Sequence, residues 1–198
     1  MMRYSLILSL LLAGCATSPP RNPDDLCAIF IEKAQWYKAA RRAERKWGLP
    51  IAMGPAFIHR ESSYESDAKP ARGKLLWVIP WRRPSSAYGY AQATDAAWED
   101  YRKESNAWFV ERDDFADALD FIGWYNQRSN RRLGIAKNNA YHLYLAYYEG
   151  PSGYAGGRWR RDRNVQRYAR IVSDRFARYA TQLGRCEDSL DKGWWPFR

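Results

Sequence analysis

The chain has 198 residues and a formal net charge of +10, and 16% of its residues are aromatic, among them 10 Trp and 14 Tyr. This length predicts one domain of ordinary size with a hydrophobic core of its own. The positive charge indicates an acidic partner, although charge alone does not distinguish nucleic acid, anionic lipid and an acidic polymer. With two His, His59 and His142, and no metal-type spacing, the sequence excludes a metal centre, and we expect neither a metal nor a cofactor.

Residues 1–14 are predicted to be a lipoprotein signal peptide. Arg3 supplies a positive start, and residues 6–12 form an apolar centre that is too short to span a bilayer as a helix. Cys15 follows the small residues Ala13 and Gly14, as in the lipobox of bacterial lipoproteins, in which this Cys becomes the acylated N-terminus. We therefore expect a lipid anchor at Cys15 that holds the protein to a membrane. A plain secretory signal with an incidental Cys is the alternative.

Export of the chain has consequences for its other cysteines and for its partner. In an oxidising compartment Cys27 and Cys186 are expected to form a disulfide that joins the two ends of the folded domain. Export also argues against nucleic acid as the partner, and aromatic residues in so basic a chain suit a glycan that carries carboxylates. Ala16, rather than Asp, after the lipidated Cys favours the outer membrane. The expected location is the periplasm, lipid-anchored to the outer membrane.

The domain organisation follows from composition and hydrophobic periodicity. After the signal peptide, residues 15–25 are Pro-rich and polar and are expected to form a tether. Residues 26–186 are expected to form a single domain, and residues 187–198 a C-terminal tail. The sequence shows no internal repeat, and we expect a monomer.

Apolar residues three and four positions apart predict a mainly α domain. A first helix is expected from about residue 26 to residue 47, with Asp24 or Asp25 as its cap. A second helix is expected to begin near Gly54, after a bend caused by the neighbouring proline, and to end near Glu61. An irregular loop or small hairpin is predicted around 72–86. Further helices are predicted at about 94–103, 113–129, 140–150 and 164–183, with a polar linker at 128–139 before the third of these.

Three short motifs contain the candidate site residues: Glu61-Ser62, Gly89-Tyr90-Ala91-Gln92 and Ala146-Tyr147-Tyr148-Glu149-Gly150. In this order and at these separations they resemble the soluble lytic transglycosylase (SLT) family, whose marks are Glu-Ser, Gly-x-x-Gln and Ala-Tyr-Asn-x-Gly. The third motif departs from the pattern, because Tyr148 replaces the Asn, so the resemblance carries over no role for that Asn side chain. The resemblance covers residues 26–186 and implies a lysozyme-like fold.

Glu61 is the candidate catalytic acid. On a helix, Gly54, Phe57 and Ile58 lie on the same face as Glu61, so the carboxyl is desolvated and its pKa is raised. A carboxyl that stays protonated near neutral pH can protonate the leaving oxygen of a glycosidic bond. The alternative is an exposed Glu just past the end of the helix, which would be ionised at neutral pH.

The resemblance implies a lytic transglycosylase that cleaves the β-1,4 bond between MurNAc and GlcNAc in peptidoglycan glycan strands. Glu61 would protonate the bridging oxygen and then, as a base, take the proton of the 6-hydroxyl, which attacks to form 1,6-anhydroMurNAc. The N-acetyl carbonyl of the sugar would stabilise the anomeric carbon, so one carboxyl is enough. A hydrolase would need a second carboxylate, for which the sequence offers four candidates: Asp67, Asp95, Glu99 and Glu149.

The resemblance also implies which residues support Glu61 and bind substrate. Gly89 would permit a tight turn, Gln92 would contact the sugar, and Tyr147 would place its hydroxyl near Glu61. Ser62 would bind near the carboxyl, although its hydroxyl could instead satisfy the helix backbone, and Tyr147 could be a core tyrosine. The candidates for stacking on sugar rings, with plain packing as the alternative, are Tyr88, Tyr90, Tyr144 and Tyr154.

Three other functions remain open from the sequence. A lysozyme would hydrolyse the same bond with water, a non-catalytic peptidoglycan-binding lipoprotein would keep the fold as an adaptor, and a basic periplasmic protein would bind anionic lipid. The replacement of Asn by Tyr148 favours the adaptor, whereas the intact Glu61-Ser62 pair argues against it.

Overall fold

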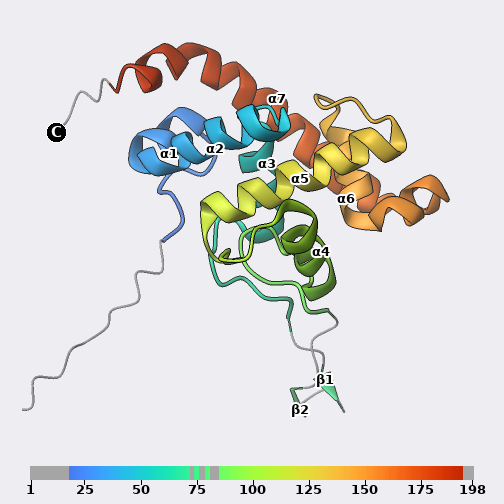
Figure 1. Cartoon of the computed structure of the whole chain (residues 1–198). Coiled ribbons are helices and arrows are strands. Elements are labelled where there is room, and N and C mark those ends of the chain that lie inside the picture. The colour runs from blue at the N-terminus through green and yellow to red at the C-terminus, as the bar shows by residue number, and fades with distance from the viewer. Residues whose placement is uncertain (1–17, 72–73, 76–78, 81–84, 194–198) are drawn as a thin grey trace, which may run out of the picture.

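A computed structural model of the protein describes residues 18–71, 74–75, 79–80 and 85–193 (Figure 1). The described part is mainly helical, as predicted, and no helix in these ranges is both long and apolar enough to span a membrane. Its elements are α1 (Leu26–Glu32), α2 (Ala34–Trp47), α3 (Met53–Ser62), β1 (Lys74–Leu75), β2 (Ile79–Pro80), α4 (Asp95–Ser105), α5 (Phe115–Leu133), α6 (Ala140–Ala155), the 3-10 turn η1 (Arg158–Arg160) and α7 (Arg163–Asp191).

The small hairpin predicted around 72–86 is present in the two strands. Lys74 pairs with Pro80 and Leu75 with Ile79, so β1 and β2 are antiparallel. The predicted signal peptide and Cys15 lie outside the described residues, as does the end of the C-terminal tail.

The first predicted helix is interrupted, because Lys33 adopts a non-helical conformation (φ −119°, ψ 65°) between α1 and α2. Asp25 is the cap of α1, since its carboxylate accepts a hydrogen bond from the amide of Ala28 at 3.1 Å. In α3 the proline lies at the third residue, where the amide that it lacks would have no partner within the helix.

Two helices are longer than predicted. The helix α5 continues to Leu133, where Gly134 closes it with a positive φ of 68°, so the predicted linker 128–139 is helical in its first part. Arginines in the last turn of α5 favour this extension, since cations stabilise a helix C-terminus. The helix α7 continues to Asp191 because Leu190, seven residues after Leu183, keeps the same face buried. The start of the predicted tail is therefore helical.

The core lies around α5, which contacts α2, α3, α4 and α6, while α7 packs along α1, α3 and α6 (Figure 1). An aromatic cluster links the elements: the ring of Trp36 stacks on that of Phe115 with centroids 3.7 Å apart. A disulfide joins Cys27 of α1 to Cys186 of α7, with their Cα atoms 6.1 Å apart, which confirms the predicted pairing. Closing so long a loop stabilises the fold by roughly 4–5 kcal/mol in the chain-entropy model.

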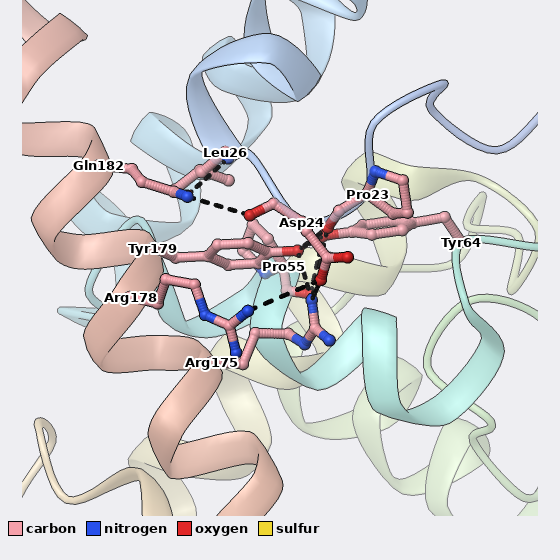
Figure 2. A network of polar contacts seen from close by, with 9 residues as sticks. All are labelled: Pro23, Asp24, Leu26, Pro55, Tyr64, Arg175, Arg178, Tyr179 and Gln182. Carbon is pink, nitrogen blue, oxygen red and sulfur yellow. Dashed lines mark hydrogen bonds and ion pairs between the residues drawn. The ribbon is translucent and has the colours of Figure 1, made fainter.

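The residues just before α1 are bound to α7 (Figure 2). The carboxylate of Asp24 forms an ion pair with Arg175 at 2.7 Å, and the carbonyl of Pro23 accepts a hydrogen bond from Tyr179. The hydroxyl oxygens of Tyr179 and Tyr64 are 3.1 Å apart. The hydroxyl of Tyr64 in turn donates a hydrogen bond of 3.1 Å to the carbonyl of Pro55 in α3. The end of the predicted tether 15–25 is therefore part of the folded domain, and it supports the helix that ends next to Glu61.

Candidate active site

Glu61 is the penultimate residue of α3, a helix that is almost entirely buried. Phe57 and Ile58, which precede it by four and three residues, are fully buried, and the side chain of Glu61 is half-buried beside them. Burial raises the pKa of Glu61 to about 7, although a hydrogen bond from Tyr144 and the charge of Arg60 act to lower it. A substantial fraction of this carboxyl is therefore protonated at neutral pH.

Tyr144 of α6 holds the carboxyl in place. Its hydroxyl donates a hydrogen bond to Oε1 of Glu61 at 2.7 Å, and its ring is buried. The ring of Phe57 packs edge-on against both Tyr144 and Tyr147, with centroid distances of 5.4 Å in each case. Because Tyr144 occupies one oxygen of Glu61, the other oxygen can carry the acid proton.

The tyrosine at the carboxyl is therefore Tyr144, three residues before the one that the sequence predicted. Tyr147 donates its hydroxyl to the carbonyl of Ala91 at 2.5 Å and not to Glu61. It still lies near enough to Glu61 for that charge, after burial, to raise the pKa of Tyr147. The two rings lie on the same side of α6, because residues three apart share a helix face, and their centroids are 6.4 Å apart. The sequence carried a weak signal for Tyr144, since it precedes the motif tyrosine by nearly one turn.

The second motif forms the tight turn that was predicted for it. Gly89 has a φ of +76°, and a Cβ there would lie 2.0 Å from the carbonyl oxygen of Arg112, so any side chain is excluded. The side-chain nitrogen Nε2 of Gln92 donates hydrogen bonds to the backbone carbonyls of Ala68 and Gly89, at 2.8 and 2.9 Å. The hydrogen bond from Tyr147 to Ala91 attaches this turn to α6. The second and third motifs thus meet on one side of Glu61.

Two predicted site residues have structural roles instead. The side chain of Tyr90 is fully buried, and its ring packs against Trp36 and Phe115 in the core, so it does not stack on a sugar. Plain packing, the alternative given for this ring, describes its surroundings. Ser62 donates its hydroxyl to the carbonyl of Ile58 at 3.2 Å, which is the backbone alternative.

The other two stacking candidates have partners away from Glu61. The hydroxyl of Tyr88 donates to Asp113 at 3.0 Å. The hydroxyl of Tyr154 lies 2.9 Å from Nδ1 of His142, and its ring stacks on Trp159.

Three of the four carboxylates considered as second catalytic groups form ion pairs elsewhere in the described part of the chain. Glu149 forms an ion pair with Arg158 at 2.9 Å, and Asp95 forms one with Arg112 at 2.8 Å. Glu99 pairs with two basic residues of its own helix, and Asp67 is exposed. None of these four carboxylates is among the groups that shift the pKa of Glu61.

A half-buried acid at the end of a buried helix, inside a mainly helical domain, is the arrangement expected of a glycan-cleaving domain with a lysozyme-like fold. The chain matches the model of the family described as transglycosylase SLT domain over residues 3–186, and it belongs to this family. The protein is therefore a transglycosylase of the kind that acts on peptidoglycan, and both the predicted family and its lysozyme-like, mainly α fold are confirmed. The sequence shows no match to curated proteins.

Proposed function

We propose that the protein is a lytic transglycosylase that cleaves the MurNAc–GlcNAc β-1,4 bond of peptidoglycan, forms 1,6-anhydroMurNAc, and uses Glu61 as its sole acid and base. The observation that carries the proposal is the state of the Glu61 carboxyl. It is half-buried on an apolar helix, is hydrogen-bonded by Tyr144, and has a pKa raised to about 7. A group with this pKa can both give and take a proton near neutral pH.

The reaction moves one proton and exchanges one bond for another. Glu61 donates its proton to the bridging oxygen as the bond from this oxygen to C1 of MurNAc breaks, while the N-acetyl carbonyl stabilises the positive anomeric carbon. The carboxylate then takes the proton of the 6-hydroxyl of the same sugar as its oxygen bonds to C1. Water is not consumed, and Glu61 ends the cycle protonated. The hydrogen bond from Tyr144 stabilises the carboxylate between the two steps.

The turn around Gly89 is proposed to form the floor of the site and to bind substrate. Its position supports this role, because the hydrogen bond from Tyr147 to the carbonyl of Ala91 connects the turn to α6, the helix that bears Tyr144. The side chain of Gln92 holds the turn itself through its bonds to Ala68 and Gly89. For Ser62 we propose a supporting role, in which it orders the last turn of α3 through its bond to the backbone.

The test is mass spectrometry of the muropeptides that the mature protein releases from purified sacculi. Anhydro ends support the transglycosylase, reducing ends would show a lysozyme, and the absence of release would favour a non-catalytic adaptor. Glu61→Gln is expected to abolish release, since an amide has no proton to donate. Glu99→Gln is the matched control, because it removes a carboxylate from the surface of α4 and is expected to retain activity.

We also propose that the protein acts in the periplasm as a monomer, anchored to the outer membrane through a lipid on Cys15. The sequence around Cys15 supports this, and the described domain begins close enough to that position for the domain to lie near the membrane. Cell fractionation tests the anchor. The wild type is expected in the outer-membrane fraction and Cys15→Ser outside it, and equal distribution of the two would contradict the proposal.

A further inference from the structure

Arg60, the residue before Glu61, is a half-buried cation that forms no ion pair with any carboxylate in the described part of the chain, although its charge acts on Glu61. Its guanidinium carbon lies 3.8 Å from the centroid of the Tyr168 ring on α7, and its Nε is buried without a hydrogen-bond partner. Among the described arginines, every other one that forms no ion pair is exposed. Partial burial of a cation without an anion is unfavourable. An anion supplied by a ligand would remove this cost.

A row of tyrosine rings connects this cation to the catalytic acid. The ring centroids of Tyr168 and Tyr148 are 6.2 Å apart, and those of Tyr148 and Tyr144 are 6.5 Å apart. Tyr144 is the hydrogen-bond partner of Glu61. Tyr148 is 54% exposed and stands where the family pattern has Asn. An exposed ring with a polar edge is suited to stack against a sugar. The row therefore runs from the buried Tyr144 at Glu61, through the exposed Tyr148, to the ring that Arg60 covers.

A second guanidinium reinforces the positive charge at the end of this row. Arg167 lies with its guanidinium carbon 5.4 Å from the same Tyr168 ring, and it forms no ion pair with any described carboxylate. The hydrogen bond from its guanidinium to the side-chain oxygen of Asn164 is long at 3.3 Å. Two arginines on one ring, neither neutralised by an acid, create a local site for an anion.

The acidic groups that face the row do not neutralise these arginines. Asp162, Glu61 and Glu149 all interact electrostatically with Tyr148. Glu149 is paired with Arg158 at 2.9 Å. Asp162 is used as the N-cap of α7, where it accepts two backbone hydrogen bonds at 2.8 and 3.1 Å. None of these three carboxylates forms an ion pair with Arg60, whose charge acts on Glu61 only at longer range.

We propose, on the basis of the proposed function, that Arg60 and Arg167 bind a carboxylate carried by the side arm of muramic acid, while Tyr148 supports the sugar ring. Guanidinium groups suit this ligand, because their planar donors match the two oxygens of a carboxylate. In peptide-free strands the carboxylate is that of the lactyl group, and in native strands it belongs to the stem peptide. The ligand chemistry is the same in both cases.

The test measures binding without turnover, in the Glu61→Gln background, so that any influence of Arg60 on the acid is removed. Isothermal titration compares soluble glycan strands that carry free carboxylates with the same strands after methyl esterification. The free acids are expected to bind about tenfold more tightly than the esters. Adding Arg60→Gln is expected to abolish this difference, whereas Arg185→Gln, which removes an exposed and unpaired charge from the far end of α7, is expected to preserve it.

Equal binding of acid and ester, or a preference for the acid that survives Arg60→Gln, would overturn the proposal. If Arg60→Gln fails to fold, which its thermal unfolding would show, the exposed Arg167→Gln is the second variant and is expected to reduce the preference severalfold. Strands with and without stem peptides identify the source of the carboxylate. The result is independent of the products that the wild type releases, so a failure of the proposed reaction would be seen separately.

Discussion

Replacing Glu61 by Gln is expected to make the protein more stable above neutral pH while removing its activity. In the folded state burial raises the pKa of Glu61 to about 7 from an ordinary value of 4.5. The folded protein thus binds this proton more tightly than the unfolded chain does. Between these two pKa values the free energy of unfolding falls as pH rises, and above about pH 7 this contribution of Glu61 to stability is fully lost.

The size of the effect follows from the two pKa values. At about 1.4 kcal/mol for each pKa unit, the ionised carboxyl lowers the free energy of unfolding by about 3 kcal/mol at pH 8. A Gln at this position has no charge to desolvate, and its side-chain oxygen still accepts the hydrogen bond of Tyr144. We therefore expect Glu61→Gln to exceed the wild type by about 3 kcal/mol at pH 8 and to equal it near pH 4.

Urea unfolding of both proteins at pH 4 and pH 8, with the disulfide intact, measures this difference. The surface control Glu99→Gln is expected to change stability by less than about 1 kcal/mol at either pH, because exposed ion pairs contribute little. If the advantage of Glu61→Gln were the same at both pH values, the carboxyl would not be desolvated in the fold. The physical basis for its role as an acid would then be lost.

Three further predictions test other parts of the structure. The rate of release of anhydro-muropeptides is expected to fall as pH rises through about 7, where Glu61 ionises. Tyr144→Phe is expected to move this fall to higher pH, because the variant removes a hydrogen bond that lowers the pKa of Glu61. A fall at the same pH in both proteins would show that Tyr144 does not lower the pKa of Glu61. Reduction of the Cys27–Cys186 disulfide is expected to lower the free energy of unfolding by about 4 kcal/mol, measured by denaturant titration with and without a thiol. Gly89→Ala is expected to lower the free energy of unfolding by at least about 2 kcal/mol in the same assay, because the new Cβ would meet a backbone carbonyl at a residue with positive φ. The control is Gly184→Ala on α7, where a Cβ has open space, and it is not expected to destabilise the protein.

Several features of the fold could be predicted because they depend on residues close together in sequence. Hydrophobic periodicity predicted the helices, and the side chains of Asp25 and Asp114 mark the starts of α1 and α5. Helix ends were less predictable. The extension of α7 to Asp191 depends on burial of Leu190 against the rest of the fold, and the break at Lys33 has no Pro or Gly to signal it.

The sequence by itself determined the family, the candidate acid at Glu61 and the pairing of the two domain cysteines, since each depends on residue type and on the order of motifs. Only the tertiary structure decided which side chains meet the acid. Tyr144 and Tyr147 share one face of α6, and the way in which α6 lies beside α3 brings the first to Glu61 and the second to the turn at Ala91. Contacts between distant segments depend on how helices pack, and periodicity along one helix does not encode this.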